Sequence, residues 1–232
     1  MIEVAPRKNE KYRISGTNVD MLFYNPEEEN FYCEPGALVC FPDTIRISPT
    51  TGTNQNASAF RKVISMGKRI AGGEDLFLLK AEGTGEVVIS GKSPGKIVPL
   101  VLSCDSPVFA LKDAFLAGSG SFDISFSVQK LSRAIFGGTG LITQKLTGNG
   151  TVFVFARGDF IVRELKEGER LLVDPANLLC WDMDFRVKTI KDIKMALFGG
   201  EGLFLAEFEG PGTLVLQSSV KPFRAKEKEK SN

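Results

Sequence analysis

Histidine is absent from the 232 residues of the chain, and cysteine and tryptophan are scarce, with four and one residues. The absence of histidine excludes imidazole general bases, histidine-dependent nucleophilic triads and histidine metal ligands together. The cysteines form no Cys-x-x-Cys pair, so neither a zinc-binding nor a thioredoxin-like motif is present. A chain of this length rarely depends on disulfides, and we expect a reducing, intracellular environment, with no metal and no cofactor.

Long hydrophobic runs are missing as well. No segment approaches the roughly 18 consecutive apolar residues of a membrane-spanning helix. Residues 1–11 lack the apolar core of a secretory signal, and Glu3 and Glu10 are untypical of a transit peptide. We therefore expect a cytoplasmic protein of prokaryotic type.

Neither sign of charge dominates, because 29 basic residues face 28 acidic ones and the net charge is +1. This balance argues against a protein that wraps nucleic acid through bulk charge, although local basic patches remain open.

What the sequence does contain is a threefold internal repeat. Each copy has a Gly-Gly pair, followed at a constant offset by a Gly-x-Gly, and the copies start 65 and 62 residues apart. We interpret all of these glycines as structural turn residues rather than as a phosphate-binding loop, because the Gly-x-x-x-x-Gly-Lys spacing is absent. They are Gly72, Gly73, Gly83 and Gly85 in the first copy, Gly137, Gly138, Gly148 and Gly150 in the second, and Gly199, Gly200, Gly210 and Gly212 in the third.

The segments on either side of each Gly-x-Gly have the composition of strands. Residues 76–82 and 86–90 flank the first, and residues 203–209 and 213–218 flank the third, so we predict a hairpin at each. The strands are apolar on both faces, which indicates that one face packs against a neighbouring repeat or subunit. Units of this size are marginal alone, and we expect a shared core.

These observations predict an all-β chain with three tandem units. We place the first at residues 1–91, with a longer polar loop at 48–66, the second at 92–158 and the third at 159–223. Residues 224–232 form a charged tail that we expect to be disordered.

Basic residues gather in the connectors that precede the Gly-Gly pairs. An anion- or partner-binding surface is one interpretation, and simple solvation of an exposed face is the other and the one we favour. The residues are Arg61, Lys62, Lys68, Arg69, Lys130, Arg133, Lys188, Lys191 and Lys194.

Acidic pairs at alternate strand positions, Asp182 with Asp184 and Glu207 with Glu209, share a face. Such pairs can share a proton or hold a metal, although solvated strand edges explain them more simply.

Three further residues invite a functional interpretation. Cys40 and Cys180 occupy equivalent repeat positions between apolar neighbours, and we expect both to be small buried hydrophobes rather than reactive thiols. Trp181 fits core or subunit packing better than ligand stacking.

The stretch Ala196 to Leu205, followed by Gly210 to Thr213 and Leu216 to Ser218, resembles the C-terminal signature of the altered-inheritance-of-mitochondria family. The stretch Gly91 to Leu100 matches as well, and the resemblance runs from about Asn18 to Phe223. It implies three copies of a short double-stranded β-helix-like unit similar to the tryptophan RNA-binding attenuator protein, and a homotrimer that forms a pseudo-ninefold ring. Fungal relatives are linked to mitochondrial inner-membrane organisation. The resemblance implies no catalytic, cofactor-binding or metal-binding residues.

Three functions remain open. The first is a non-catalytic oligomeric scaffold or interaction module. The second is a ring that binds a ligand, RNA or anionic lipid through its basic connectors. The third is a histidine-free enzyme that uses carboxylates, for which no constellation is evident.

Overall fold

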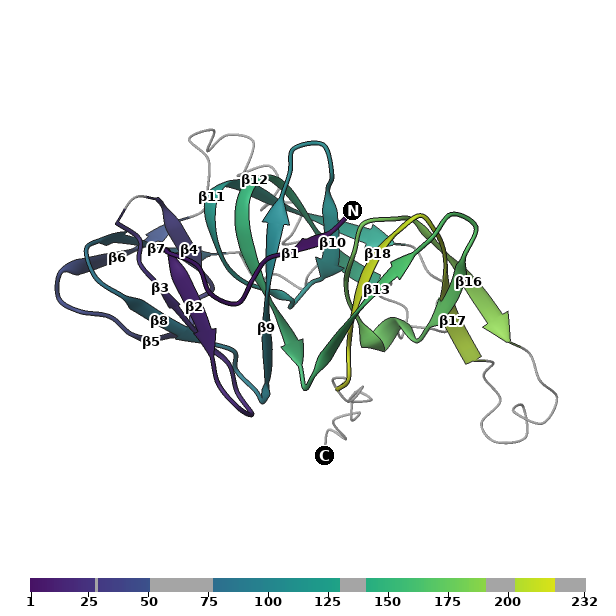
Figure 1. The fold of residues 1–232 in the computed structure, drawn as a ribbon, viewed down its shortest axis with the longest axis horizontal. Helices are drawn as coiled ribbons and strands as arrows, with labels where there is room; N and C mark the ends of the chain where they lie inside the picture. Colours follow the sequence, from purple (N-terminus) through teal and green to yellow (C-terminus); the bar gives the residue numbers. More distant parts are fainter. Residues whose placement is uncertain (28, 51–76, 130–140, 191–202, 220–232) are drawn as a thin grey trace, which may run out of the picture.

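The computed structural model describes residues 1–27, 29–50, 77–129, 141–190 and 203–219. Antiparallel strands make up almost all of the regular secondary structure in this part of the chain, and its one helix is a single 3₁₀ turn, η1 (Pro175–Asn177). The chain is therefore all-β, as predicted. Three groups of strands lie in a row along the long axis of the molecule, in sequence order (Figure 1).

The first group is built from residues 3–90. Its strands are β1 (Glu3–Val4), β2 (Tyr12–Ser15), β3 (Met21–Tyr24), β4 (Phe31–Cys33), β5 (Leu38–Cys40), β6 (Ile45–Thr50), β7 (Leu78–Gly83) and β8 (Val87–Ser90). One sheet has the order β2-β3-β8-β5, and strands β4-β7-β6 form the facing layer. Aromatic and aliphatic side chains of both layers, with Phe31 and Leu22 fully buried, form a shared core.

The middle and last groups follow. The middle strands are β9 (Gly95–Leu102), β10 (Val108–Leu111), β11 (Phe115–Gln129) and β12 (Leu141–Arg157). The last strands are β13 (Phe160–Leu165), β14 (Arg170–Val173), β15 (Leu178–Trp181), β16 (Phe185–Ile190), β17 (Leu203–Glu209) and β18 (Gly212–Gln217). Here β13-β18-β15 faces β14-β17-β16, and buried side chains of both layers, Phe208 and Leu214 among them, form a third, smaller core cluster.

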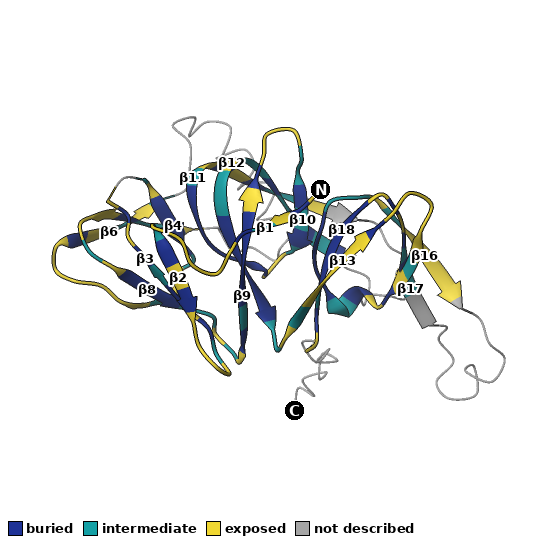
Figure 2. Cartoon of the chain, in the orientation of Figure 1, coloured by how far each residue is buried: buried dark blue, intermediate teal, exposed yellow. Residues whose placement is uncertain are grey.

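The groups are joined by strand pairing rather than by linkers. Strand β4 of the first group pairs with β11 of the middle group, and β10 of the middle group pairs with β15 of the last. One 11-stranded sheet therefore runs through all three groups. Buried residues concentrate on its central strands, whereas β13 and β16 are largely exposed (Figure 2).

The predicted hairpins at the Gly-x-Gly motifs are wrong. Strand β7 pairs with β4 and β6, and β8 pairs with β3 and β5, so the chain passes from one layer to the other between them. Strands β17 and β18 are separated in the same way. In the middle group the motif lies inside the continuous strand β12. Each motif is a corner at which one long strand changes layers.

Glycine is required at the first two of these corners because the backbone bends sharply there and the backbone of a neighbouring segment lies against the bend. Gly83 and Gly148 have φ of +128° and +113°, values that other residues rarely adopt. A Cβ at Gly148 would overlap the carbonyl oxygen of Ser121 on β11. Gly210 and Gly212 have no positive φ, and Gly212 already belongs to β18.

Two other expectations need comment. The predicted loop at 48–66 begins too early, because Ser48–Thr50 belong to β6, where they pair with β7. The Gly-Gly pairs at 72–73, 137–138 and 199–200, the remainder of that loop and the charged tail lie outside the described residues. The unit boundaries at 91 and 158 fall between strands and stay predictions.

Candidate functional site

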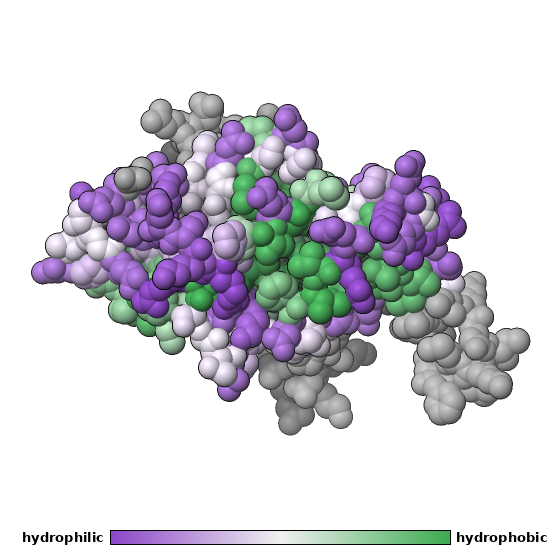
Figure 3. Space-filling view, in the orientation of Figure 1, coloured by the Kyte–Doolittle hydropathy of each residue, from purple (hydrophilic) through white to green (hydrophobic). Residues whose placement is uncertain are grey.

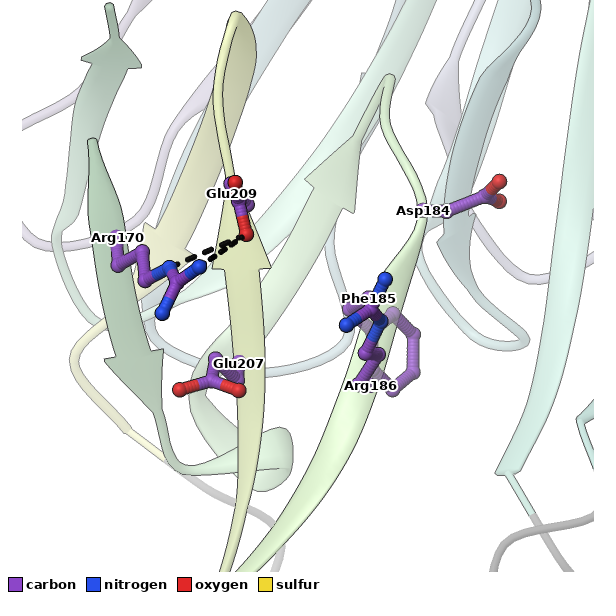
Figure 4. A pocket seen from close by; sticks show the side chains of 6 residues that line it. All are labelled: Arg170, Asp184, Phe185, Arg186, Glu207 and Glu209. Atoms are coloured by element: carbon purple, nitrogen blue, oxygen red, sulfur yellow. Dashed lines mark hydrogen bonds and ion pairs between the residues drawn. The ribbon is translucent and has the colours of Figure 1, made fainter. Parts of the chain in front are cut away.

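A charged groove lies on the outer face of the β14-β17-β16 layer. Its volume is about 340 Å³, and side chains from all three strands and from the corner before β16 line it (Figure 4). The lining residues are Arg170, Asp184, Phe185, Arg186, Glu207 and Glu209.

Ion pairs across strands account for most of the charge in this groove. The Arg170 guanidinium contacts the Glu209 carboxylate at 3.1 Å, and the Lys188 ammonium donates a hydrogen bond of 2.8 Å to Glu207. That hydrogen bond lowers the pKa of Glu207, whose side chain is 24% exposed. Exposed pairs of this kind contribute little stability and hold no ligand by themselves. The groove is therefore lined by ion pairs between neighbouring strands at the protein surface, as the simpler interpretation of Glu207 and Glu209 proposed.

The other acidic pair is not brought together. The Asp182 side chain is only 6% exposed, and it accepts hydrogen bonds from the backbone N–H groups of Ile2 at 2.5 Å and Thr213 at 2.7 Å. Asp184 is exposed, and Figure 4 shows its side chain directed away from Glu207 and Glu209. Asp182 thus fixes the N-terminal segment to the last group.

Of the nine basic residues named from the sequence, the described part of the chain contains Lys188 alone. Its charge is engaged by Glu207. Within the described ranges, no three or more histidine, cysteine or acidic side chains converge in a way that could hold a metal ion. No helix in these ranges is long and apolar enough to cross a membrane.

The two equivalent cysteines differ in burial. Cys180 is buried, and this burial raises the pKa of its thiol far above its usual range. Cys40 is exposed, so the expectation that both are buried is wrong. The reason is topological, because β15 is covered by its pairing with β10, whereas among the described residues β5 pairs with β8 alone.

Trp181 is packing, as the simpler interpretation proposed. It is 1% exposed and lies opposite Phe109 of β10, with 6.4 Å between ring centroids. Phe185 and Phe208 contact its edges. The residue closes the junction between the middle and last groups and has no free face for a ligand.

Sequence reasoning missed a buried ion-pair centre at Asp20, whose side chain is fully buried. The Arg7 guanidinium donates a hydrogen bond of 2.8 Å to its carboxylate, the Lys96 ammonium lies 3.6 Å away, and Ile97 N–H donates at 2.9 Å. The centre connects the N-terminal segment, the first group and the middle group. An Asp before a short strand carries no signal of such a role.

A second centre missed from the sequence lies where β4 meets the middle group. Burial raises the pKa of Glu34 to about 7, with the Lys92 ammonium opposing the shift and Asp113 adding to it. Lys92 lies 3.7 Å from the Glu34 carboxylate, and Glu34 N–H donates to the carbonyl of Leu116 at 2.9 Å. Glu34 is therefore a buried carboxyl group with a raised pKa at a junction between groups.

Exposed apolar residues mark the two ends of the row. Val39, Met21 and Phe41 of the first group are 53%, 40% and 42% exposed, and Leu172 of β14 in the last group is 40% exposed. Strand β5 is the counterpart of β15, and β14 is the counterpart of β10, and in the described part of the chain neither has a partner on the edge where β15 and β10 pair with each other. Within these ranges, the two ends are thus the separate halves of the junction seen inside the chain.

The model of the mitochondrial biogenesis AIM24 family matches residues 12–219. The chain belongs to this family. The resemblance seen in the sequence is confirmed over most of the chain.

Relatives of this AIM24 member agree with that assignment. It is 27% identical to an uncharacterised protein of Streptococcus pyogenes serotype M6 over 194 residues. The matched region covers 81% of this chain and 76% of the relative. It is also similar in fold to the crystal structure of protein SPYM3_0169 from Streptococcus pyogenes, with a TM-score of 0.65, 21% identity and coverage of 90% and 94% of the two chains. These relatives support the all-β fold and supply no activity.

Proposed function

We propose that this AIM24 member is a non-catalytic scaffold or interaction module, built from three attenuator-like units and assembled head to tail into a homotrimeric, pseudo-ninefold ring. The observation that carries the proposal is that the chain contains the same junction twice and that, within the described ranges, one half of it is open at each end. The cytoplasmic location belongs to this proposal, and the four unpaired thiols are consistent with it.

The strand pairing supports three equivalent units. In each group the long strand that changes layers at the Gly-x-Gly corner pairs with two neighbours in each layer. One of these neighbours carries a shift of register at the same place. That irregularity lies between Leu38 and Cys40 on β5, between Phe115 and Ala117 on β11, and between Leu178 and Cys180 on β15. Such bulges are conserved structural features rather than accidents of a single strand.

The internal junctions have a common register. Cys33 on β4 lies opposite Ala117, and Ala110 on β10 lies opposite Cys180, with both partners following the bulge. By the same register, β14 of one copy pairs with β5 of the next and places Val173 opposite Cys40. The neighbouring pair in this register is then Leu172 with Phe41, at the position that Phe109 and Trp181 fill inside the chain.

A head-to-tail contact generates either a closed ring or an open filament. A ring satisfies both open edges in every copy, which removes the aggregation hazard of exposed, apolar edge strands. Trimer closure is the stoichiometry that the family resemblance implies.

Light scattering tests the assembly directly. We expect a mass about three times 25.3 kDa, and Phe41→Glu to reduce it to that of a single chain because it places a charge in the junction. Adding Leu172→Lys to Phe41→Glu supplies an opposite charge across the junction, and we expect it to restore the trimer. Val187→Glu, at an exposed position on β16 outside the junction, is the control. A wild-type monomer, or a trimer that Phe41→Glu leaves intact, would refute the proposed junction.

A further inference from the structure

Strands β3, β9 and β13 occupy the same place in their groups. Each pairs along one edge with the central strand, namely β8, β12 and β18. The opposite edge of β3 is covered by β2, and that of β9 by β1. No residue in the described ranges pairs with the opposite edge of β13.

The three edges can be compared residue by residue. Phe23, Pro99 and Val162 are equivalent positions. They lie opposite Val88, Phe153 and Val215, and each of these three residues lies on its other side opposite the residue that follows the bulge in β5, β11 or β15. The carbonyl of Pro99 accepts a hydrogen bond of 2.9 Å from Ala5 N–H, and β2 covers Phe23 with Arg13 opposite it.

On β13 the corresponding groups are open. Ser218 N–H donates to the carbonyl of Asp159 at 2.8 Å, so residues 159, 161 and 163 direct their backbone groups toward β18. Alternation along an antiparallel strand then directs the N–H and C=O groups of Phe160, Val162 and Glu164 outward.

Side-chain burial follows the same division. Leu22 of β3 and Val98 of β9 are completely buried, whereas Ile161, at the equivalent position of β13, is 52% exposed. Figure 2 shows β9 as largely buried and β13 as largely exposed, and Figure 3 shows hydrophobic residues gathered over the region of β9 and β13.

The exposed residues of β13 specify what fits beside them. A strand that lies against this edge places one side chain beside Ile161 and a second, on the same face, beside Arg163. In β2 these inward positions are well covered, as Ile14 opposite Leu22 and Tyr12 opposite Tyr24 show at 8% and 4% exposure. Arg163 is exposed and has no ion pair within the described ranges.

We propose that the outer edge of β13 binds an extended segment of a partner protein, antiparallel to β13, with an apolar residue beside Ile161 and an acidic residue beside Arg163. The N-terminal segment of this chain is already committed to β3 and β9, so it does not supply this strand. The edge is separate from the junction strands β5 and β14, and the proposal does not depend on ring assembly. Main-chain hydrogen bonds give the affinity, and the two side-chain positions give the selectivity.

The probe is a peptide based on β2. Residues 9–16 of this chain have the right alternation, and in the register of β2 on β3 their Ile14 and Tyr12 correspond to the positions beside Ile161 and Arg163. The synthetic peptide therefore carries residues 9–16 with Tyr12→Glu. Its binding to the intact protein is followed by hydrogen exchange at the amides of residues 160, 162 and 164.

We expect the peptide to slow exchange at these three amides. Val162→Pro removes the central donor at a position where β9 already has Pro99, and it weakens binding about tenfold or more, whereas Val162→Ala retains the donor and binds within about threefold. The unmodified Tyr12 peptide binds more weakly than the Glu peptide, and Arg163→Ala removes this difference.

Three results would overturn the proposal. The first is no protection at millimolar peptide, and the second is equal binding by the Val162→Pro and Val162→Ala proteins. The third is protection of residues 160, 162 and 164 that rises with protein concentration alone, because it would show that a second copy occupies the edge.

Discussion

Replacing Asp20 with Asn tests whether the buried ion-pair centre fixes the N-terminal segment to the first two groups. Asn preserves the size of the side chain and leaves an acceptor for Ile97 N–H, but it removes the charge that faces Arg7 and Lys96. The change therefore isolates the electrostatic part of the interaction.

The magnitude follows from how well each partner can be rehydrated. Removing one member of a buried ion pair costs about 3–5 kcal/mol when the other charge stays buried. Here Arg7 and Lys96 are 43% and 20% exposed, so water recovers part of that loss. We expect Asp20→Asn to lower the free energy of unfolding by about 2–3 kcal/mol, which corresponds to a fall in Tm of roughly 5–10 °C for a chain of this size.

Urea unfolding monitored by the fluorescence of Trp181, the single tryptophan, measures this loss. Asp105→Asn, at an exposed turn position, is the matched control and changes the free energy of unfolding by less than about 0.5 kcal/mol. In the Asp20→Asn background, Arg7→Met costs less than it does alone, since the pair is already broken. A loss below about 1 kcal/mol for Asp20→Asn, with the control unchanged, would refute the reasoning.

Three further predictions concern pH, backbone shape and thiol access. Burial raises the pKa of Glu34 to about 7 from 4.5 in the unfolded chain, so the folded state binds the extra proton and its stability falls as pH rises from about 4.5 to 7, by up to about 3 kcal/mol. Glu34→Gln flattens this slope, as unfolding at pH 5 and pH 8 measures; an unchanged slope would contradict it. Gly148→Ala lowers the free energy of unfolding by about 3 kcal/mol or more, because the corner has φ +113° and no room for a Cβ, whereas the control Gly168→Ala, with φ +74° and open space, lowers it by about 1 kcal/mol. Equal losses of stability for the two variants in thermal unfolding would contradict the proposed corner. A thiol-reactive dye labels Cys40 and Cys104 in the folded protein and four cysteines after unfolding; four fast thiols in the folded state would be inconsistent with the fold.

The sequence predicted strands better than it predicted their partners. Strands do form at Leu203–Glu209 and Gly212–Gln217, because their apolar composition, with phenylalanines in the first and Thr213 and Val215 in the second, favours an extended backbone. The hairpin between them does not form, because β17 pairs with β14 and β18 pairs with β13 instead. Such pairing depends on packing between distant segments, which no local sequence pattern records. A Gly-x-Gly permits a tight turn and a sharp corner equally well.

Burial shows the same limit. Cys40 and Cys180 have similar neighbours in the sequence, yet one is exposed and the other buried, because in the described ranges the strand of Cys180 is paired at its outer edge and that of Cys40 is not. The role of Asp20 depends on Arg7 and Lys96, which approach it from two other segments. Trp181 was predictable because a large aromatic residue in an apolar strand is usually packed.

Strand continuity in the middle group bears on the order of folding. Strands β11 and β12 follow each other along the chain and pair along all of β11, from Gln129 with Leu141 to Phe115 with Val154. The consecutive pairs of the outer groups, β2 with β3 and β16 with β17, are shorter, and β4 with β7 and β13 with β18 must close longer loops. Closing a short loop costs less entropy than closing a long one, so the long β11-β12 pair forms before β4 meets β7 or β13 meets β18. The middle of the chain then serves as the template on which the two ends condense, and substitutions along β11 and β12 slow refolding more than those at either end.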